Sequence, residues 1–226
     1  MVPSEVLIPF VVHPKLGRTH IYCDPKVFPK DQTIEACHLV SYSGHAWKAV
    51  LRFSKALDLF EYARKNNDRW KEIAARDAVW AVYNLLEAVE FFRSNIKDGP
   101  LRDKIEHDKI RESSRLHRKY FPDAKAFRDA IAHIPEWTQT MDATERNAYR
   151  GCYVSDGMVL PDPNSSIIFD ADFLGDEFRT VAKGRLLKCN INQDSLQKLI
   201  EIKEIFFSSL LSVEEESIPL MGRIDY

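Results

Sequence analysis

The strongest constraint on the fold is a pair of long stretches in which apolar residues recur at helical spacing. The first extends from Gly44 to about Arg64 and the second from Asp68 to about Ile96, with Asn66-Asn67 between them. Apolar residues three or four positions apart lie on one face of a helix, so each stretch predicts a helix that packs by that face. The second stretch is the more apolar of the two, which predicts a central position in a helical bundle.

Two further helices are predicted after the break at Asp98-Gly99-Pro100. One is expected over 101–120, with fewer apolar positions, and the other over 124–133. Pro135 disfavours helical geometry in the residue before it, so we expect the latter helix to end close to His133. The signal over 27–43 is mixed because Pro25 and Pro29 interrupt it.

Extended structure is predicted both before and after the helical stretches in the sequence. Residues 5–12 and 18–23 are rich in β-formers, and a hairpin is expected around Ser155-Asp156-Gly157. Further strands are expected over 167–169, 178–182 and 185–191, before a last helix capped by Asn192. The predicted fold is therefore mainly α with a small β-region: an antiparallel helical bundle, a short antiparallel β-meander and a C-terminal helix. The predicted segments are an extended N-terminal segment or hairpin (1–43), the bundle (44–137), the meander with its closing helix (138–212) and a flexible tail (213–226).

Charge and cysteine usage narrow the classes of function. The formal net charge is −2, so affinity for nucleic acid or an anionic membrane would have to come from a local patch. The four cysteines, Cys23, Cys37, Cys152 and Cys189, lie far apart in the sequence without CxxC spacing, which disfavours a disulfide framework or structural zinc. No histidine spacing fits a metal site, and no signal peptide or membrane span is evident. We therefore predict a cytoplasmic protein that uses no metal and no cofactor.

The stretch Arg128-Asp129-Ala130-Ile131-Ala132-His133 combines residue types suited to phosphodiester chemistry. Arginine binds phosphate well, and histidine transfers protons near neutral pH. Asp129 and His133 are four residues apart on a helix, so the carboxylate is placed to accept a hydrogen bond from the imidazole. These are the groups that RNA cleavage without a metal requires.

This stretch resembles the motif of HEPN domains, in which an arginine is followed by a histidine after four to six residues. HEPN domains are helical bundles found widely in prokaryotic toxin and defence systems, and the resemblance covers about residues 44–137. It implies a metal-independent endoribonuclease that acts as a homodimer with both motifs in one cleft. By this resemblance Arg128 binds the scissile phosphate, His133 is the general acid or base, and Asp129 is the polar residue that often follows the arginine.

Alternative hypotheses explain the same residues. Arg128 and Asp129 are also typical of a surface ion pair, and His133 of a residue that caps a helix end. The protein would then be a non-catalytic interaction or regulatory module of a defence or toxin–antitoxin-type system, with a cognate protein partner and a vestigial motif. A small-molecule sensor with a pocket between the bundle and the β-region is a third hypothesis.

Secondary candidates lie on the two neighbouring helices. Arg111, Arg115, Arg118 and Lys119 form a basic run that could contact RNA phosphates, but acidic residues are interleaved with it, so a solvated helix face is the favoured interpretation. Asp77, Asn84 and Glu87 share one stripe of the second long helix. They are candidates for a polar network beside the motif or for one that specifies helix packing.

Overall fold

The computed structural model describes residues 16, 18, 21, 23–66, 69–137 and 139–213, with the backbone alone for 134–137. Its helices are α1 (Thr33–Tyr42), α2 (Gly44–Lys65), α3 (Trp70–Asn95), α4 (His107–Tyr120), α5 (Ala124–Trp137), α6 (Met141–Asn147) and α7 (Gln193–Ser208). Short 3-10 turns occur at Pro25–Val27 and Leu211–Val213. The strands are β1 (Tyr149–Arg150), β2 (Tyr153–Val154), β3 (Val159–Leu160), β4 (Ser166–Ile167), β5 (Asp172–Leu174), β6 (Glu177–Ala182) and β7 (Arg185–Asn190). The predicted fold class is thus confirmed.

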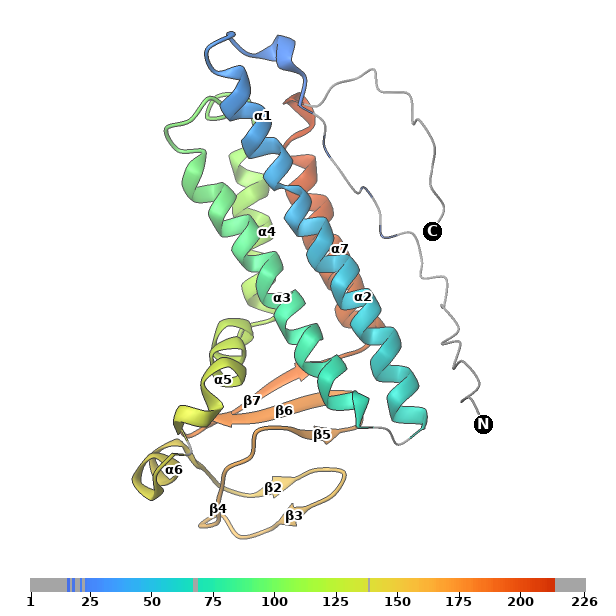
Figure 1. The fold of residues 1–226 in the computed structure, drawn as a ribbon, viewed down its shortest axis with the longest axis vertical. Helices are drawn as coiled ribbons and strands as arrows, with labels where there is room; N and C mark the ends of the chain where they lie inside the picture. Colours follow the sequence, from blue (N-terminus) through green and yellow to red (C-terminus); the bar gives the residue numbers. More distant parts are fainter. Residues whose placement is uncertain are drawn as a thin grey trace, which may run out of the picture.

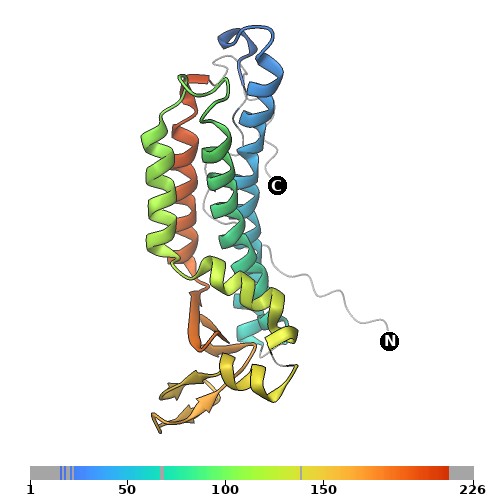
Figure 2. The ribbon, with the colours of Figure 1, turned by 90° about the vertical axis from the view of Figure 1, so that its left-hand side faces the viewer.

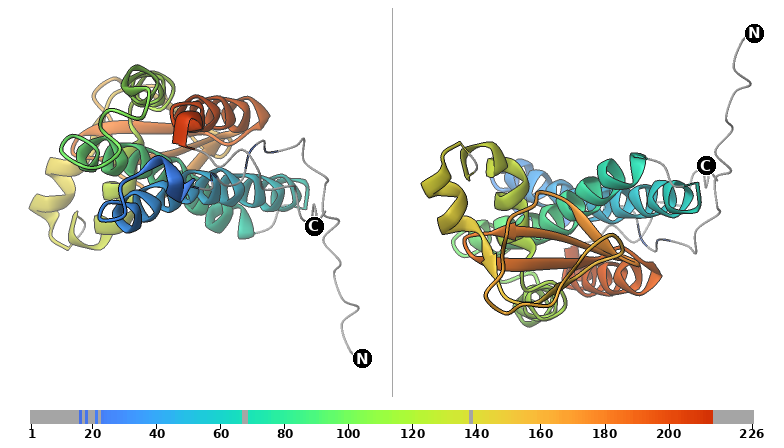
Figure 3. Two further views of the ribbon diagram at one scale, coloured as in Figure 1. Left: turned by 90° about the horizontal axis from the view of Figure 1, so that it is seen from above. Right: turned by 90° about the horizontal axis from the view of Figure 1, so that it is seen from below.

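Four long helices, α2, α3, α4 and α7, form an elongated bundle in which successive helices run in opposite directions (Figure 1). Each packs against two neighbours, so that α2 and α4 stand at diagonally opposite corners, as the view along the bundle in Figure 3 shows. The helix α1 continues the bundle beyond the start of α2. The closing helix α7 supplies the fourth corner although a β-region of more than forty residues separates it from α5.

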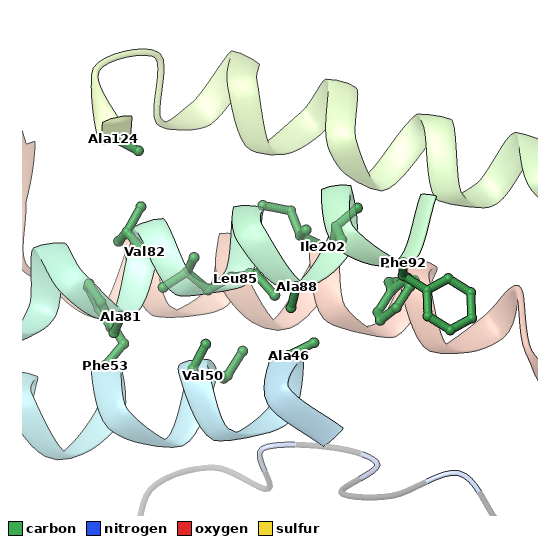
Figure 4. Close-up of a cluster of buried hydrophobic side chains, with 14 of the residues drawn as sticks. Ala46, Val50, Phe53, Ala81, Val82, Leu85, Ala88, Phe92, Ala124 and Ile202 are labelled. Carbon is green, nitrogen blue, oxygen red and sulfur yellow. The ribbon is translucent and has the colours of Figure 1, made fainter. Parts of the chain in front are cut away.

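Alanines allow α2 and α3 to approach closely. Ala46, Ala49 and Ala56 of α2 and Ala74, Ala81 and Ala88 of α3 are all buried. Small side chains shorten the distance between two helix axes, so this is the most extensive helix contact of the fold. Larger residues such as Val50, Phe53, Leu85 and Ile202 fill the centre (Figure 4).

The β-region closes one end of the bundle. Strands β5, β6 and β7 form an antiparallel sheet, and β6 and β7 are joined by Lys183 and Gly184, which both have positive φ (51° and 71°). Such a two-residue turn matches the twist of paired strands. The pairs β1–β4 and β2–β3 lie farther out, below the sheet in Figure 1. The predicted hairpin around Ser155-Asp156-Gly157 is present as β2 and β3.

Charged and aromatic contacts attach the sheet to the α2–α3 end of the bundle. The Arg76 guanidinium lies 2.7 Å from the Asp170 carboxylate, and Arg64 pairs with Asp176. The Lys71 ammonium lies 4.0 Å from the centre of the Phe173 ring, and burial lowers the pKa of this lysine. On the other side, α5 lies across β6, with Phe127 and Phe178 in ring contact. Figure 2 shows α5 turning away from the bundle axis toward the sheet.

Several element boundaries differ from the sequence-based predictions. The expectation that Pro135 ends its helix near His133 was wrong, because α5 continues to Trp137. Pro135 lacks the N–H that would donate to the carbonyl four residues earlier, so α5 continues past it with one helical hydrogen bond fewer. The third helix begins at His107 rather than Leu101, since 99–105 form turns that still bury Leu101 and Ile105.

Other differences concern whole elements. The mixed segment 27–43 contains α1, which begins four residues after Pro29, and α6 was not predicted. The expected strand at 5–12 and the tail beyond Val213 lie outside the described residues, as do three of the six residues 18–23.

Candidate functional site

The candidate site lies where α5 meets the outer side of α3. The two guanidinium Nη atoms of Arg128 are both engaged: Nη2 donates to the hydroxyl of Tyr83 at 2.8 Å, and Nη1 lies 3.0 Å from Oδ1 of Asp129. The guanidinium carbon is 4.3 Å from the centre of the Tyr83 ring and 5.9 Å from that of Trp80. Arg128 is therefore held in one orientation over aromatic rings, a favourable arrangement for a cation.

Arg128 is partly accessible despite these contacts. Its side chain is 24% exposed, and that of Asp129 is 31% exposed. The Nε atom is buried and has no hydrogen-bond partner in the described part of the chain. A guanidinium has five N–H donors, so the Nη hydrogens not used for Tyr83 and Asp129 are the ones suited to a further oxygen ligand at this half-buried edge.

His133 follows on the same helix and is half-buried. The helix geometry places it about 140° around α5 from Arg128, since successive residues are separated by about 100°. Asp129, which we expected beside His133, ion-pairs with Arg128. A hydrogen bond between Asp129 and His133 stays a prediction.

Tyr83 is the residue of the candidate site that the sequence did not predict. Tyr83 is buried and accepts a hydrogen bond from Arg128. Burial, and to a smaller extent a hydrogen bond with Glu87, raises the pKa of Tyr83, whereas Arg128 lowers it. Nothing in the motif indicates a residue 45 positions earlier in the chain. Its spacing of three from Trp80, on the helix judged most central, was the one available signal.

The polar stripe of α3 consists of Asp77, Asn84 and Glu87, and its two acidic residues have different partners. Glu87 contacts Tyr83 and so belongs to the surroundings of the motif. Asp77 instead accepts a hydrogen bond from Nε of Arg52 on α2 at 2.8 Å. Asn84 lies between them and is half-buried. The stripe therefore joins α2 to the motif rather than forming one closed network.

The basic run of α4 is largely paired with carboxylates. Arg111 lies 2.7 Å from Asp108, Arg115 lies 3.9 Å from Glu112, and Arg118 lies 2.8 Å from Glu90. Lys119 lies over the ring of Tyr120. These pairs agree with the interpretation of α4 as a solvated face.

A small cavity lies between the bundle and the β-region, where the sensor hypothesis expects a pocket. Its volume is about 90 Å³, and it is lined by residues of α3, β7, α7 and the α4–α5 connection, including Phe121, Lys188, Asn190 and Lys198. Ligand sites usually enclose at least about 300 Å³. The cavity is too small to favour a sensor of ordinary metabolites.

The cysteines are all free in the structure, and no cluster of three metal-ligating side chains occurs among the residues described. Cys23 and Cys37, distant in sequence, are hydrogen-bonded neighbours. Burial and this neighbour raise the pKa of Cys23 to about 12. Burial likewise raises the pKa of Cys189 to about 12, so neither thiol is poised as a nucleophile.

Comparison with known proteins adds no relative. The chain matches no protein-family model, no curated protein and no solved structure. In the part of the chain that the structure describes, no helix is both long and apolar enough to cross a membrane.

Proposed function

We propose that the protein is a HEPN-like, metal-independent endoribonuclease that acts in the cytoplasm as a homodimer. The observation that carries the proposal is the fixed orientation of Arg128 over Tyr83 and Trp80, at a half-buried edge of the helix that also bears His133. A preorganised cation stabilises charge that develops in a transition state more effectively than a mobile one. The resemblance of the motif to HEPN domains gives these residues their roles.

In the proposed reaction Arg128 binds the scissile phosphate. The 2′-oxygen of the RNA attacks phosphorus, and the bond from phosphorus to the 5′-oxygen breaks. His133 takes the proton of the 2′-hydroxyl or supplies the proton that the departing 5′-oxygen acquires. The products are a 2′,3′-cyclic phosphate and a 5′-hydroxyl end. Asp129 orients the guanidinium of Arg128 through their ion pair.

The test is incubation with a mixed pool of single-stranded RNA in EDTA. We expect the wild type to produce 2′,3′-cyclic phosphate ends, and Arg128→Ala or His133→Ala to abolish cleavage. Arg111→Ala is the matched control, because it removes an arginine that is paired on the exposed side of α4. An all-DNA substrate lacks the nucleophile and should stay intact. A strict requirement for magnesium, or cleavage of DNA, would contradict this mechanism.

A second candidate function is a non-catalytic interaction module with a cognate protein partner. It is favoured by one observation: both Nη atoms of Arg128 already have partners within the chain. In that case His133→Ala should lower the unfolding free energy by about 1 kcal/mol through a lost buried contact. Neither the wild type nor the variant should cleave RNA. A melting curve measured beside the cleavage assay separates the two functions.

A further inference from the structure

The outer face of α2 carries a row of basic side chains, His45, Lys48, Arg52 and Lys55, here called the α2 ridge. The four residues are spaced by three or four positions, so they lie along one side of the helix, and all are exposed. Within the described structure, Lys48 and Lys55 have no ion-pair partner, and Arg52 pairs with Asp77. The described part of α4 differs in that its basic run has three paired arginines and a single lysine, Lys119, without a carboxylate beside it.

A series of contacts connects the α2 ridge to the candidate site. Arg52 binds Asp77, which lies three residues before Trp80 on the outer side of α3. The half-buried Trp80 ring in turn lies 5.9 Å from the guanidinium carbon of Arg128. Along α3, Trp80 therefore lies between Asp77, which Arg52 contacts, and Tyr83, which Arg128 contacts. The α2 ridge is thus linked to Arg128 through neighbouring turns of α3.

The chemistry of this face fits a single-stranded polyanion that has aromatic bases. Cations in a row neutralise successive phosphates, and a partly exposed indole offers a surface on which a base can stack. An acidic protein segment would use the cations but not the indole. The ridge spans ten residues of helix, about 15 Å, which corresponds to about four stacked nucleotides at roughly 3.4 Å each.

We propose that the α2 ridge binds the backbone of single-stranded RNA and leads the strand over Trp80 to Arg128. This inference rests on the proposed function, since it names the surface that holds the substrate of that site. It shifts the RNA-binding role from the basic run of α4 to the opposite corner of the bundle.

The test measures RNA binding separately from cleavage. All proteins carry His133→Ala, so that a fluorescent oligouridine stays intact during anisotropy titrations at several salt concentrations. The ridge variant is Lys48→Ala/Arg52→Ala/Lys55→Ala. The control is Arg111→Ala/Arg115→Ala/Lys119→Ala, which removes the same charge from α4. Circular dichroism and melting curves establish that both variants are folded.

We expect the ridge variant to lose affinity by roughly ten-fold or more near physiological salt. Its slope of log affinity against log salt should fall by about 2, because each phosphate contact of a single strand contributes about 0.7. The control should retain the affinity and slope of the parent. Equal losses in both variants, or no loss in the ridge variant, would overturn the inference. Competition by polyglutamate as effective as by unlabelled RNA would also overturn it, in favour of an acidic protein partner.

The outcomes distinguish this inference from the proposed function. If the ridge variant loses binding while the protein with His133 intact never cleaves RNA, the nuclease proposal fails and the α2 ridge stands. If the protein with His133 intact cleaves RNA and the ridge substitutions leave both affinity and cleavage rate unchanged, the nuclease proposal stands and the ridge inference fails.

Discussion

At the scale of single residues, Arg128 shows how a buried hydroxyl can orient a cation at the candidate site. Tyr83→Phe keeps the ring beneath the guanidinium and removes the acceptor of its 2.8 Å hydrogen bond. We expect a loss of about 1 kcal/mol of unfolding free energy, and a fall in RNA cleavage because Arg128 is no longer held in place. Urea unfolding and the EDTA cleavage assay measure the two effects.

The matched control is Tyr42→Phe. Tyr42 is a half-buried tyrosine whose ring stacks on Phe91 at 4.0 Å, and stacking survives the substitution. The unfolding free energy and the cleavage activity of the Tyr42→Phe variant should equal those of the wild type. Unchanged cleavage in Tyr83→Phe would mean that the hydroxyl has a structural role alone.

The buried His117 should make the stability of the protein depend on pH. It is completely buried in α4, its Nε2 contacts the Val82 carbonyl at 2.8 Å, and burial lowers its pKa from 6.5 to about 4. The unfolded chain therefore binds a proton at a higher pH than the folded chain does. Stability is fully present above about pH 6.5 and falls as the pH drops toward 4, by about 3 kcal/mol from this group. Urea unfolding at pH 7 and pH 4 should show this loss in the wild type. His117→Gln, which cannot titrate, should lack that part of the loss.

The sequence predicted the candidate-site residues of α5 and the polar stripe of α3, and it missed Tyr83. Arg128, Asp129 and His133 are recognisable because their spacing on α5 is fixed by local geometry. Tyr83 and the proximity of Cys23 to Cys37 depend on how helices pack, and packing partners leave no local pattern. For the same reason the sequence could not show that Asp77 and Glu87, which share a stripe, have partners on different helices.

At the scale of elements, α7 holds the chain that precedes α1. Its Lys203 side chain is fully buried, and the ammonium donates to the carbonyl oxygen of Arg18 at 2.9 Å and to that of Leu16. The neighbouring Glu204 accepts from the amide of Arg18 at 3.0 Å. A buried ammonium is tolerated only where such acceptors surround it, and burial lowers its pKa.

Lys203→Met should therefore release this part of the chain. We expect the Arg18 amide to exchange its hydrogen faster, because the carbonyls that fix its position lose their donor. Lys198→Met is the control on the same helix: Lys198 is a partly exposed lysine paired with Asp194. Hydrogen exchange followed by mass spectrometry compares the two. Equal protection of Arg18 in both variants would contradict this role of Lys203.

Long periodic helices and the hairpin of β2 and β3 were predictable, whereas α1, α6 and the end of α5 were not. The helices α2 and α3 and the capped start of α7 follow from apolar spacing and from Asn192, whose Oδ1 accepts from the Ser195 amide at 3.0 Å. The helix α1 begins soon after Pro29, and Pro135 is accommodated within α5, so in both places the tertiary context outweighed a local breaker.

At the scale of the whole molecule, the bundle is completed by a helix from the far side of the β-region. Leu196, Leu199, Ile202 and Phe206 of α7 are buried in the same core as α2, α3 and α4. Residues 44–137 by themselves supply three of the four corners and would leave that apolar surface uncovered. Along the chain the β-region lies between α5 and α7. Both of its ends are therefore connected to helices that pack in the bundle or against the sheet.

The last prediction concerns assembly. The motif lies at one edge of the molecule, and such an edge cannot enclose an RNA strand, so the proposed nuclease requires a two-fold dimer with both motifs in one groove. Ala132 is exposed on α5 beside His133, which makes it a suitable reporter. In a Cys152→Ser background, which removes the exposed cysteine, Ala132→Cys should form a disulfide-linked dimer under mild oxidation. Glu112→Cys on α4 is the control and should remain monomeric on non-reducing gels. Light scattering should give twice the chain mass for the parent. A monomer in solution, or cross-linking through α4 alone, would rule out a shared cleft at Arg128 and His133.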